Sequence, residues 1–163
     1  MESLAISPII TGASHNRFTS EGGYMQGLTL EAANKCLERA VAKAAAEFKR
    51  PVGVAVCDAY GFLVAFSRMD GAPIRSIAIS QQKAHTATRM GISTDAFLER
   101  LRSENIDISY FCDPLMTALP GGNLLKDKNG AIVGAIGISG LKAVEDQVIT
   151  EYVAKLYESG EMG

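Results

Sequence analysis

The sequence has no tryptophan, only two histidines and only three cysteines. Cys36, Cys57 and Cys112 are far apart and form no CxxC motif, and the two histidines, His15 and His85, lie in separate regions of the chain. A zinc cluster needs about four ligands that come together at short spacings, which these residues do not provide. We therefore predict no metal site, and we interpret the cysteines as buried, reduced thiols of a cytoplasmic protein.

Long apolar runs and clustered positive charge are also missing. The longest apolar run, 131–138, has about eight residues, far fewer than a membrane-spanning helix needs. Residues 1–12 carry an acid, Glu2, and no basic segment, so we expect no secretory signal. Lys and Arg number 16 against 18 Asp and Glu, and they are scattered along the chain. We therefore expect neither a nucleic acid nor a membrane as a partner.

What the sequence does have is enough apolar content for one core. Apolar residues make up 47% of the 163 residues and charged residues 21%, as expected for a single globular domain. Residues 1–27 lack periodicity and are rich in small polar residues, so we interpret them as an N-terminal arm. Residues 28–163 then form the domain.

Helical and strand patterns alternate along this domain. They predict a helix, two strands, two helices, at least two further strands and a last helix. The expected ranges are 30–48, 52–56, 62–66, 76–89, 94–104, a strand–turn–strand unit within 119–140, and 144–156. We expect Thr29 to cap the first helix, and we expect the 76–89 helix to be capped by Ser76 and to stop at Gly91. Tight turns at 58–61 and 128–130 make the strands that they join antiparallel. The predicted fold is α+β, a central antiparallel sheet flanked by helices.

Six of the chain's 16 glycines fall within residues 119–140. The spacing of Gly134, Gly137 and Gly140 differs from the GxGxxG loop of dinucleotide-binding proteins, and the first two lie inside a strand. Glycine within a strand allows a bulky neighbour to approach the backbone: a helix, another subunit or a ligand. We therefore expect a homo-oligomer.

The Pro120-Gly121-Gly122 segment precedes this glycine-rich strand. Two glycines after a proline can expose backbone N–H groups in a conformation that few other residues adopt, which suits an oxyanion or another anionic group. A tight bend with no ligand is equally compatible with the same residues. Both interpretations stay open on the sequence alone.

Several motifs, in order, resemble the GlcG/HbpS family over about residues 28–157. They are 51–58, Gly61, 68–73, 83–87, 120–122, 130–140 and 145–146. The resemblance implies a profilin-like or PAS-like α/β fold, usually oligomeric, with links to haem binding or haem degradation. A similar domain ends the PduO corrinoid adenosyltransferases, and other members accompany catabolic enzymes. The chain departs from the family pattern at Asn123 and Leu124, after the glycines, and at Gln147, where an acid is usual.

Three residues are candidates for chemistry. His85, on the 76–89 helix, could ligate a haem iron or act as an acid or base near neutral pH. Lys83 shares that helix but points to another face, where it could pair with a carboxylate or a haem propionate. Asp146 lies at the start of the last helix, where it favours the helix dipole. If Asp146 faced Pro120–Gly122, it could instead move protons there. These roles require the Pro120–Gly122 bend, the 76–89 helix and the start of the last helix to converge on one cavity, which we expect.

Four further residues are candidates for ligand binding. Asp70 and Arg75 flank a turn before the 76–89 helix, where Asp70 can brace the turn and Arg75 can hold a carboxylate. Tyr110 and Phe111 form an aromatic pair that either lines a pocket or fills the core.

Two functions follow from these candidates. The first is a small-ligand-binding protein with haem or another tetrapyrrole as the leading ligand, an expectation that depends mainly on the resemblance and on His85. The alternative is a cofactor-independent enzyme, an isomerase, tautomerase, lyase or hydrolase acting on a small acidic metabolite. No reaction-specific motif favours the alternative.

Overall fold

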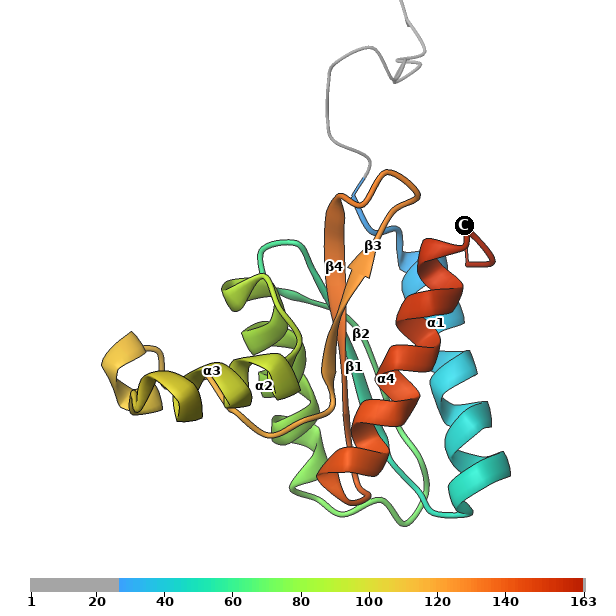
Figure 1. Ribbon diagram of the computed structural model, residues 1–163. Helices are drawn as coiled ribbons and strands as arrows, with labels where there is room; N and C mark the ends of the chain where they lie inside the picture. Colours follow the sequence, from blue (N-terminus) through green and yellow to red (C-terminus); the bar gives the residue numbers. More distant parts are fainter. Residues whose placement is uncertain (1–26, 163) are drawn as a thin grey trace, which may run out of the picture.

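The structure is a computed structural model that describes residues 27–162 (Figure 1). The predicted N-terminal arm, 1–27, lies outside the described residues except for Gly27, as does His15. The elements are α1 (Leu30–Lys43), a π-helical turn (Ala44–Phe48), β1 (Gly53–Asp58), β2 (Leu63–Arg68), α2 (Ser76–Met90), α3 (Thr94–Glu104), a 3-10 turn (Ile108–Phe111), β3 (Gly122–Lys126), β4 (Ile132–Ser139) and α4 (Ala143–Glu158). The predicted element order and the α+β class are confirmed.

The four strands form one sheet in the order β2-β1-β4-β3, and every neighbouring pair is antiparallel. The two predicted hairpins supply the outer pairs, β1 with β2 and β3 with β4. The central pair joins the hairpins, with Val54 opposite Ile138. The pairing of β3 with β4 brings the start of β3 and the end of β4 to the same end of the sheet, because Gly122 lies opposite Gly137.

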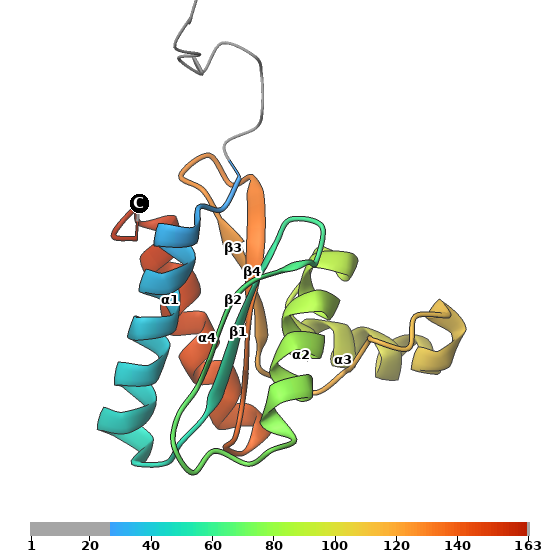
Figure 2. The same cartoon turned by 180° about the vertical axis from the view of Figure 1, so that it is seen from behind.

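Helices cover the two faces of the sheet unequally. Helices α1 and α4 pack side by side on one face, and α2 covers the other, with α3 projecting away from the sheet (Figures 1 and 2). The larger core lies between the sheet and α1 and α4, and Val54, Ile136 and Ile149 are fully buried in it. Small residues such as Ala84, Ala87 and Ala135 line the α2 side, so this helix lies close to the strands.

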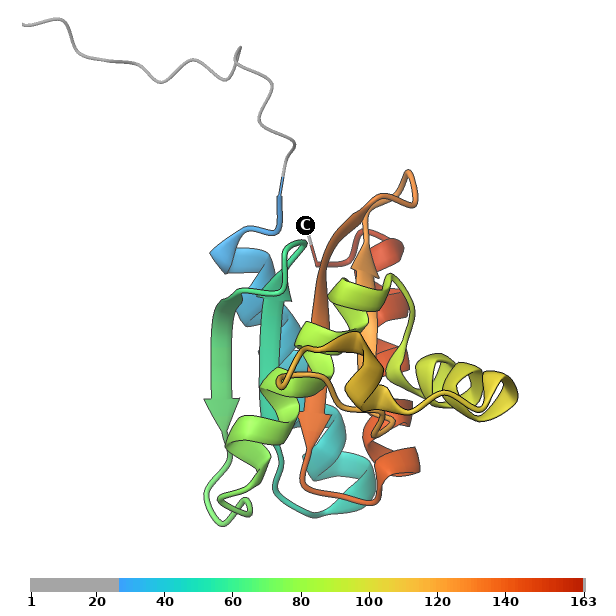
Figure 3. The same ribbon diagram turned by 90° about the vertical axis from the view of Figure 1, so that its left-hand side faces the viewer.

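The glycine inside β4 serves that close approach. A Cβ atom built at Gly137 would meet the backbone of α2 at Ser80 and Ala84, closer than real Cβ contacts come. Figure 3 shows α2 crossing in front of the sheet. The sequence left a helix, another subunit or a ligand open as the close neighbour of this glycine, and in the structure the neighbour is a helix, α2.

Local signals explain most element ends. Thr29 caps α1 by accepting a hydrogen bond from Ala32 N at 3.1 Å, as predicted. Helix α2 ends at Gly91 in the left-handed conformation, also as predicted. Ser76 is the first residue of α2 and its N-cap is Arg75, so the prediction of Ser76 as a cap was wrong by one residue. Among residues 27–162, no helix combines the length and the apolar character that crossing a membrane requires.

Candidate functional site

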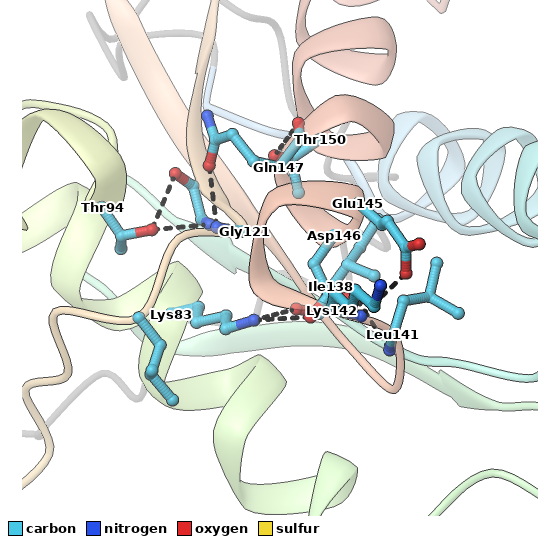
Figure 4. Close-up of polar contacts among 12 residues, drawn as sticks. Lys83, Thr94, Gly121, Ile138, Leu141, Lys142, Glu145, Asp146, Gln147 and Thr150 are labelled. Carbon is cyan, nitrogen blue, oxygen red and sulfur yellow. Dashed lines mark hydrogen bonds and ion pairs between the residues drawn. The ribbon is translucent and has the colours of Figure 1, made fainter.

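A buried ion pair joins α2 to the start of α4. Lys83 Nζ lies 2.8 Å from Asp146 Oδ2 and also donates to the backbone oxygen of Ile138 at 2.8 Å (Figure 4). The other carboxylate oxygen, Asp146 Oδ1, accepts from Leu141 N at 3.1 Å. Lys83 is 1% exposed and Asp146 2%. The pair therefore ties α2, the end of β4 and α4 together through the interior.

Burial opposes the charges of this pair. It raises the pKa of Asp146, against the lowering effect of the Lys83 ammonium. It also lowers the pKa of Lys83, against the raising effect of the Asp146 carboxylate. For each group the charge of the partner is the main influence that opposes the effect of burial, as is usual for an ion pair in an apolar interior.

The Pro120–Gly122 bend packs directly against the ion pair. Gly121 has a φ of +118°, and a Cβ atom there would lie 2.7 Å from Asp146 Cβ and 2.8 Å from Lys83 Nζ. Glycine is therefore required at this position by both conformation and space.

The two amides of the bend already have partners. Gly121 N donates to Gln147 Oε1 at 2.7 Å, and Gly122 N donates to Thr94 Oγ1 at 2.9 Å (Figure 4). In the sequence, Gln147 stands out only as a departure from the family pattern, and no pattern indicates Thr94 as a partner of the bend. In the structure both side chains satisfy buried backbone donors, so this bend does not offer free N–H groups to an anion.

The expectation that the Pro120–Gly122 bend, the α2 helix and the start of α4 meet at one cavity is thus met in part. Lys83, Gly121 and Asp146 converge, as predicted, but they meet in a packed interior instead of a cavity. His85 lies elsewhere, as expected from its position on α2. The catalytic roles of Lys83 and Asp146 stay predictions, and each would require this interior to open.

His85 is held between a carboxylate and a backbone carbonyl. Its Nε2 lies 2.8 Å from Asp113 Oδ2, and its Nδ1 lies 3.4 Å from the oxygen of Gly61. The other oxygen of Asp113 accepts from Leu115 N at 2.9 Å. The hydrogen bond from His85, together with that from Leu115 N, lowers the pKa of Asp113. Asp113 was not among the predicted site residues, because it lies in a segment without periodicity and 28 residues from His85.

A pocket of about 340 Å³ adjoins His85, between α2 and the β1–β2 turn. Its wall is mostly apolar, with Cys57, Phe62, Leu63, Ile77, Ala78 and Leu115. His85, Gln81 and Gln82 are its polar side chains. Burial raises the pKa of the Cys57 thiol to about 12, so this group enters the wall as a neutral thiol.

The four other predicted ligand-binding residues lie outside the wall of this pocket. Asp70 and Arg75 are exposed on the turn before α2. Tyr110 is 74% exposed, and Phe111 packs edge-to-face on Phe97 with the ring centroids 5.3 Å apart. The aromatic pair was expected either to line a pocket or to fill the core. Phe111 packs against another side chain, whereas the exposed Tyr110 does neither.

Comparison with known proteins agrees with this architecture. A family model described as "Haem degrading protein HbpS-like" matches residues 28–155. Protein GlcG of Escherichia coli K12 is 38% identical over 88 residues, which are 54% of this chain and 63% of GlcG. The activity and partners of GlcG as a whole are therefore not transferred by this match.

Solved structures are similar over most of the chain. A double mutant of Streptomyces reticuli HbpS has a TM-score of 0.72 and 29% identity, covering 94% of this chain and 98% of HbpS. A PduOC:haem complex has a TM-score of 0.70 and 24% identity, covering 79% of this chain and 94% of PduOC, and it shows the fold alone. The protein therefore belongs to the GlcG/HbpS family, as the resemblance of its motifs predicted.

Proposed function

We propose that the protein binds a flat, mostly apolar small ligand, with haem or another tetrapyrrole as the leading candidate, in the pocket beside His85. The observation that carries the proposal is an apolar pocket whose wall contains a histidine held by a carboxylate. A family model that names haem degradation supports the choice of ligand.

The chemical character of the pocket wall supports a tetrapyrrole as the ligand. Phe62, Ile77 and Leu115 offer apolar surface to the faces of a macrocycle. Bound haem would supply an iron that accepts an imidazole nitrogen. His85 lies in the pocket wall and could provide that nitrogen, and its hydrogen bond to Asp113 matches the carboxylate–histidine arrangement common among metal ligands. Cys57 is a poor candidate for ligation, because its thiol stays protonated.

The enzyme alternative receives less support from the geometry. It needs Lys83 or Arg75 to hold a substrate carboxylate and the Gly121 and Gly122 amides to stabilise developing charge. Lys83 is buried against Asp146, and both amides are already bonded to side chains. The enzyme would therefore have to break these interactions before it could hold a substrate. Binding in the His85 pocket requires no such rearrangement, so we favour binding.

The proposal is tested by titrating the protein with haemin and following the Soret band at micromolar concentration. We expect saturable binding to the natural chain and at least a tenfold loss in Ala78→Trp, because Ala78 lines the pocket and a tryptophan would fill it. Ala154→Trp is the matched control, since Ala154 lines a different pocket beside α4. Equal binding by Ala78→Trp and the natural chain would show that haemin binds elsewhere.

A further inference from the structure

We infer that Asp113 positions His85 by holding the proton on Nε2, which leaves Nδ1 as the nitrogen that meets the ligand. The inference rests on the proposed function, since it names the atom of the pocket that the ligand contacts. It assigns a role to a residue that belongs to none of the motifs shared with the GlcG/HbpS family.

The two ring nitrogens have unequal partners. The Nε2 contact at 2.8 Å is an ordinary charge-assisted hydrogen bond to a carboxylate. The Nδ1 contact at 3.4 Å exceeds the usual range of about 2.7–3.2 Å for a hydrogen bond from nitrogen. A neutral imidazole carries one proton, and the shorter contact with a charged acceptor is where that proton is most stable. The lone pair then lies on Nδ1, on the Gly61 side.

The Gly61 side is the side of the pocket. Gly61 belongs to the pocket wall and Asp113 does not. Turning the ring about its hydrogen bond to Asp113 would take Nδ1 away from the Gly61 oxygen without breaking the stronger contact. A ligand group that accepts the Nδ1 electron pair, such as the iron of a metalloporphyrin, would thus leave the hydrogen bond to Asp113 intact.

The turn that carries Gly61 is built to keep the ring in place. Asp58 Oδ1 accepts from both Tyr60 N and Phe62 N at 2.9 Å, which fixes the turn around Gly61. Gly61 has a φ of +86°, and a Cβ atom there would lie 3.0 Å from Nδ1 of His85. Only glycine leaves room for the imidazole at this point.

Asp113 uses its two carboxylate oxygens for different partners, so one substitution can change the contact with His85 and keep the hydrogen bond from Leu115 N. In Asp113→Asn the Oδ1 atom can still accept from Leu115 N, while an amide group replaces the Oδ2 acceptor. The amide donates to Nε2, so the ring proton moves to Nδ1 and the lone pair leaves the pocket side. Asp107→Asn is the matched control, because Asp107 accepts a similar hydrogen bond from Ser109 N and makes none with His85.

The test is a two-bond proton–nitrogen correlation spectrum of the imidazole rings at pH 8, without ligand. The chain has two histidines, so His15→Gln identifies the His85 signals. We expect the Nε2–H tautomer in the natural chain and in Asp107→Asn, and the Nδ1–H tautomer in Asp113→Asn. We also expect Asp113→Asn to bind haemin about tenfold more weakly. An Nδ1–H tautomer in the natural chain, or no change in Asp113→Asn, overturns the inference.

The two proposals fail separately. A natural chain with the expected tautomer that binds no haemin overturns the proposed ligand and, with it, the assignment of Nδ1 to a haem iron. Haemin binding that is lost in Ala78→Trp but is equal in Asp113→Asn and the natural chain overturns the role of Asp113 alone.

Discussion

Lys83 Nζ and Asp146 Oδ2 lie 2.8 Å apart in the interior, although 63 residues separate them in the sequence. Removing one partner leaves a buried charge without compensation, which costs about 3–5 kcal/mol of unfolding free energy in comparable cases. We expect Lys83→Met to lose about that much in urea denaturation. The double variant Lys83→Met/Asp146→Leu should recover a large part of the loss, because it removes both charges.

An exposed ion pair gives the control for this prediction. Lys35 and Glu31 lie 3.0 Å apart on the surface of α1, one helical turn from each other. Lys35→Met should change the unfolding free energy by less than about 1 kcal/mol. A similar small effect of Lys83→Met would contradict the account of the buried pair.

The glycine of β4 provides a second prediction about stability. Gly137→Ala places a methyl group against the backbone of α2 at Ser80, and a backbone contact cannot turn aside as a flexible side chain can. We expect a loss of about 3 kcal/mol or more, at the upper end of overpacking effects. Gly91→Ala is the comparison, since that Cβ would meet open space and only the left-handed φ of +66° opposes it, for about 1 kcal/mol. Thermal unfolding followed by circular dichroism should rank the two variants in that order.

The pocket hydrogen bonds imply a dependence of stability on pH. The pKa of Asp113 is lowered in the folded protein, first by the hydrogen bond from His85. Because this pKa is lowered, the ionised carboxylate stabilises the folded protein at pH values above the ordinary carboxyl pKa of about 3.9. That stabilisation is lost as the pH falls through the pKa of Asp113 in the folded protein. Urea midpoints measured from pH 6 to pH 3 should therefore fall less steeply for Asp113→Asn than for the natural chain. An equal or steeper fall would contradict the hydrogen-bonding arrangement at His85.

The three cysteines should differ in reactivity. Burial raises the pKa of both Cys36 and Cys57 to about 12, whereas Cys112 is exposed, so the prediction of a buried thiol was wrong for Cys112. A thiol reagent such as dithionitrobenzoate at pH 8 should therefore modify one thiol rapidly in the folded protein and all three in denaturant. Cys112→Ser should abolish the rapid reaction. Rapid modification of Cys57 in the native state would show that the wall of the pocket is open to water.

Local patterns predicted the fold well because each element carries its own signals. Thr29 and Gly91 mark helix ends, and the turns predicted at 58–61 and 128–130 determine both hairpins. The pairing of β1 with β4 joins segments far apart in the chain, so the strand order could not be derived from local patterns. The glycine-rich strand was predicted to admit a close neighbour, and its neighbour at Gly137 is α2. The homo-oligomer that the sequence suggested stays a prediction.

The candidate site was predicted less completely, because its contacts, like the pairing of β1 with β4, join segments far apart in the chain. The family motifs identified Lys83, Gly121 and Asp146 as important, but hydrogen-bond partners and burial depend on the packed structure. Gln147, which differs from the family pattern, accepts a hydrogen bond from the bend. Asp113 meets His85 across 28 residues and lies in a loop, where no periodicity indicates which way a side chain points.

The central claim is that the ligand occupies the pocket between α2 and the β1–β2 turn. The most direct measurement is a backbone proton–nitrogen spectrum of labelled protein during titration with haemin, whose paramagnetic iron broadens the signals of nearby amides. We predict broadening centred on residues 57–63, 77–85 and Leu115, with residues 148–158 of α4 much less affected. Broadening centred on α4, or none at saturating haemin, would contradict the account.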